Sequence, residues 1–191
     1  MKFIIEHLEP ELYEWCLIEY EHISKIVGKQ NLIFTDIKDK DTKKLKKYGK
    51  VYKKSIVELN FKSICVLNQY SKKTLITKDK NKFKYLVVGG ILGDNQAKKR
   101  TNILINNLKK HKIKFEERNL DNKQMPTDAA VFVAKKILEG KTLNDFKFID
   151  KVEIEINENE SVTLPFRYVI DNHKLIIYEK LVDYLRKRKE F

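Results

Sequence analysis

The order of apolar and polar residues at the amino terminus predicts a strand, a helix and a second strand. Lys2–Glu6 is short and mostly apolar, as expected of a buried strand. In Glu11–Val27, apolar residues recur at helical spacing with one polar break, and Pro10 and Gly28 suit the first turn and the end of a helix. Asn31–Thr35 is again apolar. This β-α-β order is typical of a parallel sheet.

The alternation of strands and helices continues as far as Gly140. Strands are predicted at Ile64–Leu67, Tyr85–Val88 and Ile113–Glu117, and helices at Thr101–Lys110 and Ala129–Glu139. Thr127 or Asp128 is expected to cap the last helix, and Gly140 to end it. We therefore expect an α/β domain with a mostly parallel sheet and helices on both faces.

The pattern changes from residue 151 onward. Val152–Ile156 alternates charged and apolar residues, Val162–Ile170 is strand-like around Pro165, and Glu179–Lys189 is a basic terminal helix. No low-complexity linker separates the two parts. The sequence predicts one α/β domain at residues 1–150 and a small β/α extension at residues 151–191.

Lys38 to Lys54 is a basic stretch with few apolar residues, and Lys72–Lys82 is a predicted loop. In the basic stretch, Tyr48 and Tyr52 lie between lysines. This arrangement is typical of nucleic-acid binding, in which aromatic rings stack on bases and lysines bind phosphates. A solvated amphipathic helix explains the same spacing and is the favoured interpretation.

Composition and charge are those of a globular chain with a preference for polyanions. The 191 residues are 42% hydrophobic and 35% charged, enough for a sizeable core. The net charge of +13 favours RNA as a partner, although a lysine-rich proteome in which charge is a solubility trait explains it equally well.

Two isolated cysteines and the lack of a long apolar run predict a cytoplasmic protein with no membrane partner. Cys16 and Cys65 lie in apolar stretches without a C-x-x-C pattern, so we expect buried, reduced thiols. The first residues turn acidic too early for a signal peptide. No apolar run reaches the roughly 18 residues that a membrane-spanning helix needs.

The most informative segment for function runs from Tyr85 to Asp94. Its apolar strand ends on Gly89-Gly90, and Gly93 precedes the acidic Asp94. A second polar, loop-like segment, Arg118–Asp128, leads into the last predicted helix. Since both follow predicted strands, they indicate a small-molecule site built from loops at strand ends.

Several other kinds of site are excluded. The glycines match neither a phosphate-binding P-loop nor G-x-G-x-x-G, and no G-x-S-x-G occurs. His7, His22, His111 and His173 lie in different predicted elements without ligand spacing, so no metal is predicted. What remains is a pocket of backbone groups and small residues, which suits an uncharged aromatic ring with a polar tail.

Several segments in order along the chain resemble one protein family. They are Met1–Tyr20, Val88–Asp94, Arg100-Thr101, Gln124–Ala129, Phe146–Asp150 and Leu164–Val169. They look like the SPOUT-superfamily group predicted to be S-adenosylmethionine-dependent methyltransferases, found in archaea and eukaryotes. The resemblance implies a deep trefoil knot at about residues 64–140, an exception to un-knotted topology, with the cofactor bent in its loops.

The resemblance also implies which residues line the cofactor pocket. They are Leu67, Asn68, Gly89, Gly90, Ile91, Leu92, Gly93, Arg118, Leu120, Gln124, Met125, Thr127 and Ala129. The chain departs from the family pattern at Asn68-Gln69, where Asp-Pro is expected, and at Asn95–Ala97, where His-Pro-Pro is common. Asp121 replaces a usual glycine, and Pro126 a threonine or serine.

Methyl transfer from a sulfonium requires the methyl donor and the acceptor to be positioned in line. A general base is needed if the acceptor loses a proton during the attack. Glu6, Asp94 and Asp128 are the candidate bases; each also has a structural explanation, as a surface carboxylate, a turn residue and a helix cap. Arg100 is a candidate for substrate binding together with Lys98 and Lys99. Arg100 and Arg118 also suit the cofactor carboxylate or surface ion pairs.

Three hypotheses for the acceptor follow. An RNA acceptor, either ribosomal RNA or tRNA, is favoured by the superfamily's chemistry and by the net charge. A ribosomal-protein arginine is the alternative, since the eukaryotic branch of the family is linked to it; Glu6, Glu9, Glu11 and Glu14 would then line a guanidinium slot. A non-catalytic RNA-binding assembly factor is the third. Both a homodimer and a monomer remain open.

Overall fold

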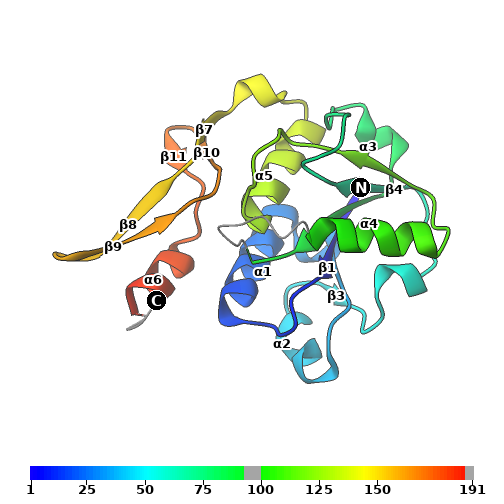
Figure 1. Ribbon diagram of the computed structural model, residues 1–191, viewed down its shortest axis with the longest axis horizontal. Coiled ribbons are helices and arrows are strands. Elements are labelled where there is room, and N and C mark those ends of the chain that lie inside the picture. The colour runs from blue at the N-terminus through cyan, green and yellow to red at the C-terminus, as the bar shows by residue number, and fades with distance from the viewer. Residues whose placement is uncertain (93–99, 188–191) are drawn as a thin grey trace.

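The protein is built around a six-stranded parallel sheet with the strand order β3-β2-β1-β5-β4-β6 (Figure 1). The structure is a computed structural model, and it describes residues 1–92 and 100–187. The strands in chain order are β1 (Lys2–His7), β2 (Leu32–Thr35), β3 (Lys50–Val51), β4 (Ile64–Leu67), β5 (Tyr85–Gly90) and β6 (Phe115–Arg118).

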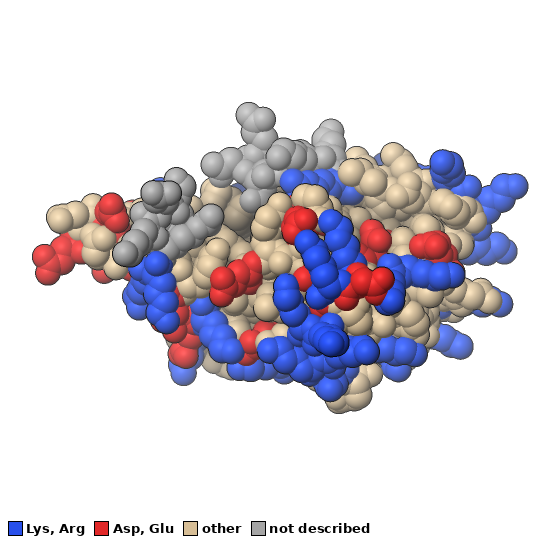
Figure 2. Space-filling view, turned by 90° about the horizontal axis from the view of Figure 1, so that it is seen from below, with Lys and Arg blue, Asp and Glu red and all other residues tan. Residues whose placement is uncertain are grey.

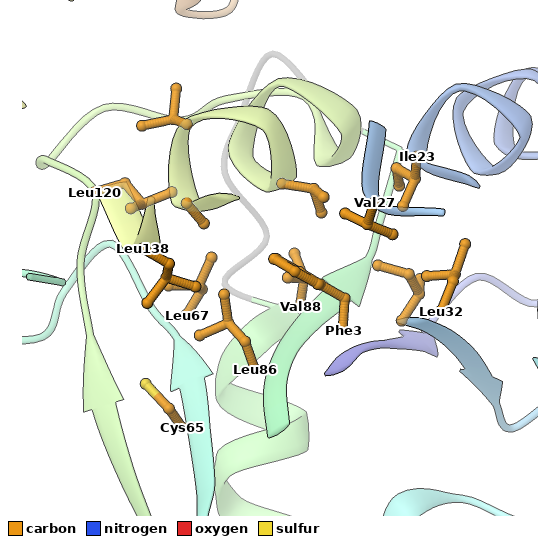
Figure 3. Close-up of a cluster of buried hydrophobic side chains, with 14 of the residues drawn as sticks. Phe3, Ile23, Val27, Leu32, Cys65, Leu67, Leu86, Val88, Leu120 and Leu138 are labelled. Carbon is orange, nitrogen blue, oxygen red and sulfur yellow. The ribbon is translucent and has the colours of Figure 1, made fainter. Parts of the chain in front are cut away.

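Helices cover both faces of the sheet, as predicted. The helices of this part of the chain are α1 (Glu14–Val27), α2 (Thr42–Leu45), α3 (Asp79–Lys82), α4 (Arg100–Lys110) and α5 (Thr127–Leu138). Phe3 and Ile5 of β1 pack on the side of α1 and α5, whereas Ile4 packs on the side of α4. Figure 3 shows the α1–α5 side of this core, with labelled side chains from the strands and the helices.

The carboxyl-terminal residues form a small separate set of strands and one helix, which packs against α1. They comprise β7 (Lys147–Ile149), β8 (Val152–Asn157), β9 (Glu160–Leu164), β10 (Tyr168–Asp171), β11 (Lys174–Leu175) and α6 (Glu179–Lys187). β8 and β9 form an antiparallel hairpin, and β10 lies between β7 and β11. Their apolar side chains share a core with Trp15 and Ile18 of α1, so this extension lies beside α1 and α5 (Figure 1).

Several predicted elements differ in the structure: the predicted loop Lys72–Lys82 contains α3, and β5 ends at Gly90 rather than at Val88. The first helix begins at Glu14 rather than Glu11, because Tyr13 before it has extended backbone. The predicted strand Val162–Ile170 is two strands of different sheets, since Pro165 between them has no backbone N–H for a ladder. Helix α5 begins at Thr127 after Pro126, so neither predicted residue caps it.

The basic stretch from Lys38 to Lys54 is not an amphipathic helix. It contains the four-residue α2 and the short β3, with Gly49 so close to β2 that a Cβ there would lie 2.8 Å from the Leu32 carbonyl oxygen. Lysine ammonium groups cover one face of the Tyr48 ring and one face of the Tyr52 ring, at 4.7 and 4.8 Å from the ring centroids. The lysines themselves gather on the face that contains α2 (Figure 2).

No helix within residues 1–92 and 100–187 is long and apolar enough to cross a membrane. Cys16 and Cys65 are free and buried, as predicted. Burial raises the pKa of each thiol to about 12, so both stay protonated.

Candidate active site

A pocket opens at the carboxyl ends of β4 and β5 and is closed by the segment between β6 and α5. Because parallel strands end at one edge of the sheet, the two loops singled out in the sequence meet there. The lining residues are Leu67, Asn68, Gln69, Tyr70, Val88, Gly89, Ile91, Leu92, Arg100, Thr101, Leu120, Asp121, Lys123, Gln124, Met125, Thr127 and Ala130.

The structure brings most of the predicted cofactor residues to this pocket. Those that line it are Leu67, Asn68, Gly89, Ile91, Leu92, Leu120, Gln124, Met125 and Thr127. Gly90, Arg118 and Ala129 lie elsewhere. Gly93, together with the candidate residues Asp94, Lys98 and Lys99 and the departure at 95–97, falls outside the described residues.

Gly90 and Arg118 have structural roles instead. β5 continues through Gly90, so Gly90 faces the opposite side of the strand from Gly89, and a Cβ on it would overlap the Tyr20 hydroxyl. The Arg118 guanidinium is buried and donates two hydrogen bonds of 2.9 Å to the Asp79 carboxylate, which ties β6 to α3. Ala129 is buried in α5.

The loop after β4 is fixed without the expected Asp-Pro. The Asn68 amide donates to Glu117 at 2.7 Å, its oxygen accepts the Tyr70 N–H at 3.1 Å, and its backbone N–H donates to the Arg118 carbonyl at 2.8 Å. This Asx turn restricts the backbone of the loop, as the ring of a proline would. Asp121, in place of glycine, adopts a positive φ of 102° and forms an ion pair with Arg167.

Glu6 does not line the pocket. Its carboxylate is buried and accepts hydrogen bonds from the Thr35 and Ser55 hydroxyls and from the Ile56 N–H at 3.1 Å. Burial raises the pKa of Glu6. The role of Glu6 is therefore to hold the chain after β2 against β1.

Three buried carboxylates gather next to the pocket, and we call Glu9, Glu19 and Asp128 the acidic cluster. Glu9 accepts the Leu92 N–H at 2.7 Å and forms an ion pair with Arg100. Of the four glutamates predicted to form a slot, Glu9 alone contacts pocket residues in the described part of the chain; Glu11 pairs with Lys40 on the surface.

The other two members of the acidic cluster lie between α1 and α5. Asp128 Oδ2 lies 2.7 Å from His22 Nδ1, and Trp15 Nε1 donates to Glu19 at 3.0 Å. Burial raises the pKa of Glu19 well above its usual value, and the nearby negative charge of Asp128 raises it further. Glu19 therefore holds a proton that an exposed glutamate would have lost.

Tyr168 and His22 link the extension to the acidic cluster. The buried Tyr168 hydroxyl has no hydrogen-bond partner within residues 1–92 and 100–187. Burial raises the Tyr168 pKa, and the nearby acidic groups of Asp128 and Glu19 raise it further. The His22 ring stacks on Tyr178 of the extension, with centroids 4.8 Å apart. Sequence reasoning missed Glu19, His22 and Tyr168; the one local sign was the polar break at Glu19 in an apolar helix face.

No group of three or more histidine, cysteine or acidic side chains is arranged to hold a metal ion in the part of the chain that the structure describes.

Fold and pocket together define an S-adenosylmethionine-dependent methyltransferase, as the comparisons with known proteins show. The chain belongs to the SFM1-like protein arginine N-methyltransferase family, whose model matches residues 2–190. It is 36% identical over 213 residues to protein arginine N-methyltransferase SFM1 of Saccharomyces cerevisiae, covering 98% of this chain and 95% of the yeast protein.

Solved structures agree with this assignment. The crystal structure of yeast SFM1 complexed with S-adenosylmethionine (SAM) matches with a TM-score of 0.86 and 34% identity, over 97% of this chain and 90% of the yeast chain. The crystal structure of a dual specific Trm10 from Thermococcus kodakaraensis matches with a TM-score of 0.58 and 18% identity, over 75% of this chain and 95% of that one. The second likeness concerns the fold alone.

The residues of the pocket fit S-adenosylmethionine. Leu67, Val88, Leu120 and Met125 offer apolar surface for the adenine ring, and Gly89 presents backbone without a side chain. The lining also contains the polar side chains of Asn68, Gln124 and Arg100.

Proposed function

We propose that this protein transfers a methyl group from S-adenosylmethionine to an arginine side chain of another protein. The observation that carries the proposal is the buried carboxylate of Glu9, which already pairs with a guanidinium, that of Arg100, at the pocket. Carboxylates attract and orient a guanidinium, whereas they repel the phosphates of RNA. The family membership favours the same acceptor. The RNA acceptor favoured by the net charge therefore gives way to the protein-arginine alternative.

The net charge of +13 does not oppose a basic protein as substrate, because the charge is unevenly distributed. The hairpin β8–β9 exposes Glu153, Glu155, Glu158 and Glu160, and Val152–Leu164 contains no lysine or arginine. In Figure 2, acidic side chains occupy the end of the molecule where this hairpin projects, and lysines gather over the body. A basic substrate therefore meets acidic as well as basic surfaces.

The reaction forms an N–C bond at a guanidinium nitrogen, breaks the S–C bond and releases one proton. Bound S-adenosylmethionine supplies the activated methyl group. The chain contributes position: Glu9 attracts the guanidinium, and the apolar pocket walls keep water from the reacting atoms. The released proton goes to solvent at the edge of the pocket, because Asp128, which contacts His22, does not line the pocket.

The proposal includes the topology of the SPOUT class. The likeness in fold to Trm10, and a pocket made by the loops that follow β4, β5 and β6, support a trefoil knot at about residues 64–140. They also support residues 1–150 as the methyltransferase domain and 151–191 as an extension, although β7 already pairs with β10. A crystal structure that traces the whole chain tests the threading.

Ribosomal fractions incubated with the protein and methyl-labelled S-adenosylmethionine test the acceptor. We expect label that survives ribonuclease, is released by protease and is recovered as methylarginine after hydrolysis. S-adenosylhomocysteine, the product, serves as the inhibited control. Label that survives protease and is released by ribonuclease would show that the acceptor is RNA and would refute the proposal.

A further inference from the structure

The six parallel strands of the sheet all begin at one edge, opposite the edge that holds the pocket. The pairing register places Tyr85 of β5 level with Lys2 of β1, and Ile64 of β4 level with both Tyr85 and Phe115 of β6. A strand of six residues such as β5 is about 20 Å long. The starts of the strands therefore form a surface that is distant from the pocket.

A lysine stands at the start of every strand of this sheet. Each is either the first residue of its strand or lies within the three residues before it, and all are exposed. We call these lysines the basic edge: Lys2, Lys29, Lys50, Lys62, Lys84 and Lys114.

Backbone hydrogen bonds show that the middle of the basic edge is continuous. The Lys2 N–H donates to the Lys84 carbonyl at 2.9 Å, and the Lys84 N–H donates to the carbonyl of Ser63, the residue after Lys62, at 2.9 Å. These three lysines therefore lie on neighbouring strand starts.

The same row extends to both sides of the sheet. Lys2, Lys29 and Lys50 line one shallow hollow at the starts of β1, β2 and β3. On the other side, Lys114 precedes β6, which pairs with β4. Since adjacent strands lie about 4.8 Å apart, a row across all of them is about 24 Å long.

Little negative charge compensates the basic edge. From three residues before each strand to its second residue, all within the described residues, Glu116 is the one acidic residue, and it pairs with Lys82 and Arg118. Within residues 1–92 and 100–187, no lysine of the basic edge forms an ion pair with an acidic side chain. Like charges in such a row attract a polyanion, whose binding releases condensed counterions.

The surroundings of the basic edge favour a nucleic-acid backbone over a membrane or an acidic protein. Membrane-surface and protein partners both need exposed apolar anchors beside the charges. In the part of the chain that the structure describes, the large apolar side chains that are exposed belong to other segments: Tyr13, Tyr70, Ile76, Ile103 and Ile149. A row of cations about 24 Å long without such anchors suits a chain of consecutive phosphates.

We infer that the basic edge is a binding surface for RNA, which contacts the protein through its phosphates and without base sequence preference. The RNA is a ligand there and not the methyl acceptor, because the pocket lies at the opposite edge of the sheet. The inference goes beyond the proposed function. It gives the positive charge a location and a partner while the acidic side chain of Glu9 stays at the pocket.

Fluorescence anisotropy with a labelled polyuridine of about 20 nucleotides, at several salt concentrations, tests the inference. The test variant is Lys2→Gln/Lys62→Gln/Lys84→Gln. We expect the slope of log K against log salt to become shallower by about 2, because each phosphate contact contributes about 0.7 with a single strand. At about 0.1 M salt, RNA binding should weaken at least about tenfold.

A matched control separates this surface from net charge. Lys147→Gln/Lys151→Gln/Lys174→Gln removes the same number of exposed lysines from a different part of the molecule. This variant should bind RNA within about threefold of the original chain. Equal losses in the two triple variants, or no loss in the test variant, would overturn the inference. Polyglutamate or phosphatidylserine vesicles bound as tightly as RNA would overturn it as well.

Footprinting of the original chain tests the same surface without any substitution. An amine-reactive label is applied with and without the polyuridine, and modified lysines are identified by mass spectrometry. We expect RNA to protect Lys2, Lys62 and Lys84; stronger protection of Lys147 and Lys174 would contradict the assignment. Neither measurement uses methyl transfer, so a failure of the proposed function would leave both results unchanged.

Discussion

Gly90→Ala should destabilise the protein without weakening cofactor binding by the folded molecules. The structure gives the two adjacent glycines of β5 different roles. A Cβ on Gly89 would meet only side-chain carbons of Ile91 and Leu8, at 3.0 and 3.1 Å. A Cβ on Gly90 would lie 2.9 Å from Ile5 Cγ2, 3.1 Å from Tyr20 Cζ, and on the Tyr20 hydroxyl itself.

The loss of free energy of unfolding on Gly90→Ala depends on how far the Tyr20 side chain has to move. Tyr20 is fully buried between α1 and the sheet, and its hydroxyl lies 2.8 Å from His7 Nδ1. Overpacking at such a site costs about 2–3 kcal/mol. Tyr20→Phe alone loses one buried hydrogen bond, about 1 kcal/mol. Because Tyr20→Phe removes the overlapping oxygen, the double variant should cost about 2 kcal/mol, so the two changes couple by about 1–2 kcal/mol.

Equilibrium urea unfolding, followed by the fluorescence of the single tryptophan Trp15, measures all four corners of this cycle. The dissociation constant for S-adenosylmethionine, corrected for the folded fraction, is measured in parallel. Additive free energies of unfolding would refute the assigned clash. A stable Gly90→Ala variant that binds the cofactor at least tenfold more weakly would show that Gly90 belongs to the cofactor site after all.

Three further predictions follow from buried charges. Arg118→Met leaves the Asp79 carboxylate buried without its partner and should lower the free energy of unfolding by about 3 kcal/mol in the same urea assay; a loss below about 1 kcal/mol would contradict this. The raised pKa of Glu19 means that the unfolded chain loses this proton first as pH rises above the usual glutamate value, so stability should fall with pH by up to about 1.4 kcal/mol per unit until the folded pKa is reached. Glu19→Gln should abolish this fall, and an unchanged pH dependence of unfolding would refute the burial argument. His22→Ala removes both the contact with Asp128 and the stacking on Tyr178, and should cost about 1–2 kcal/mol and increase proteolysis of the extension; an unchanged proteolysis rate would show that His22 does not hold the extension in place.

Local patterns predicted the parallel sheet and the position of the pocket well. The strand Ile64–Leu67 has the predicted bounds, because four apolar residues between polar breaks leave little freedom in register. Gly89, near the end of β5, and Gln124, Met125 and Thr127, which follow β6, line the pocket because these parallel strands end at one edge of the sheet. The bounds of such strands and the position of these loops depend on residues that are neighbours in the sequence, so a sequence pattern can predict them.

The acidic cluster could not be predicted in this way, because contacts between distant residues build it. His22 and Asp128 are 106 residues apart, and Tyr178 of the extension stacks on His22. Adjacent residues of a strand face opposite sides, so the end of β5 decides which glycine lines the pocket, and the pattern placed that end two residues early. Glu6 was misjudged for the same reason: its partners Ser55 and Ile56 are remote in sequence.

The central claim is that the acceptor is a protein arginine. The most direct test is tandem mass spectrometry of a ribosomal fraction after reaction with S-adenosylmethionine that carries a deuterated methyl group. Proteins and nucleosides from the same reaction are analysed side by side. We predict a deuterated methyl group on an arginine side chain, formed by the original chain and strongly reduced with Glu9→Gln. A deuterated methyl group on a nucleoside, with none on arginine, would contradict the claim.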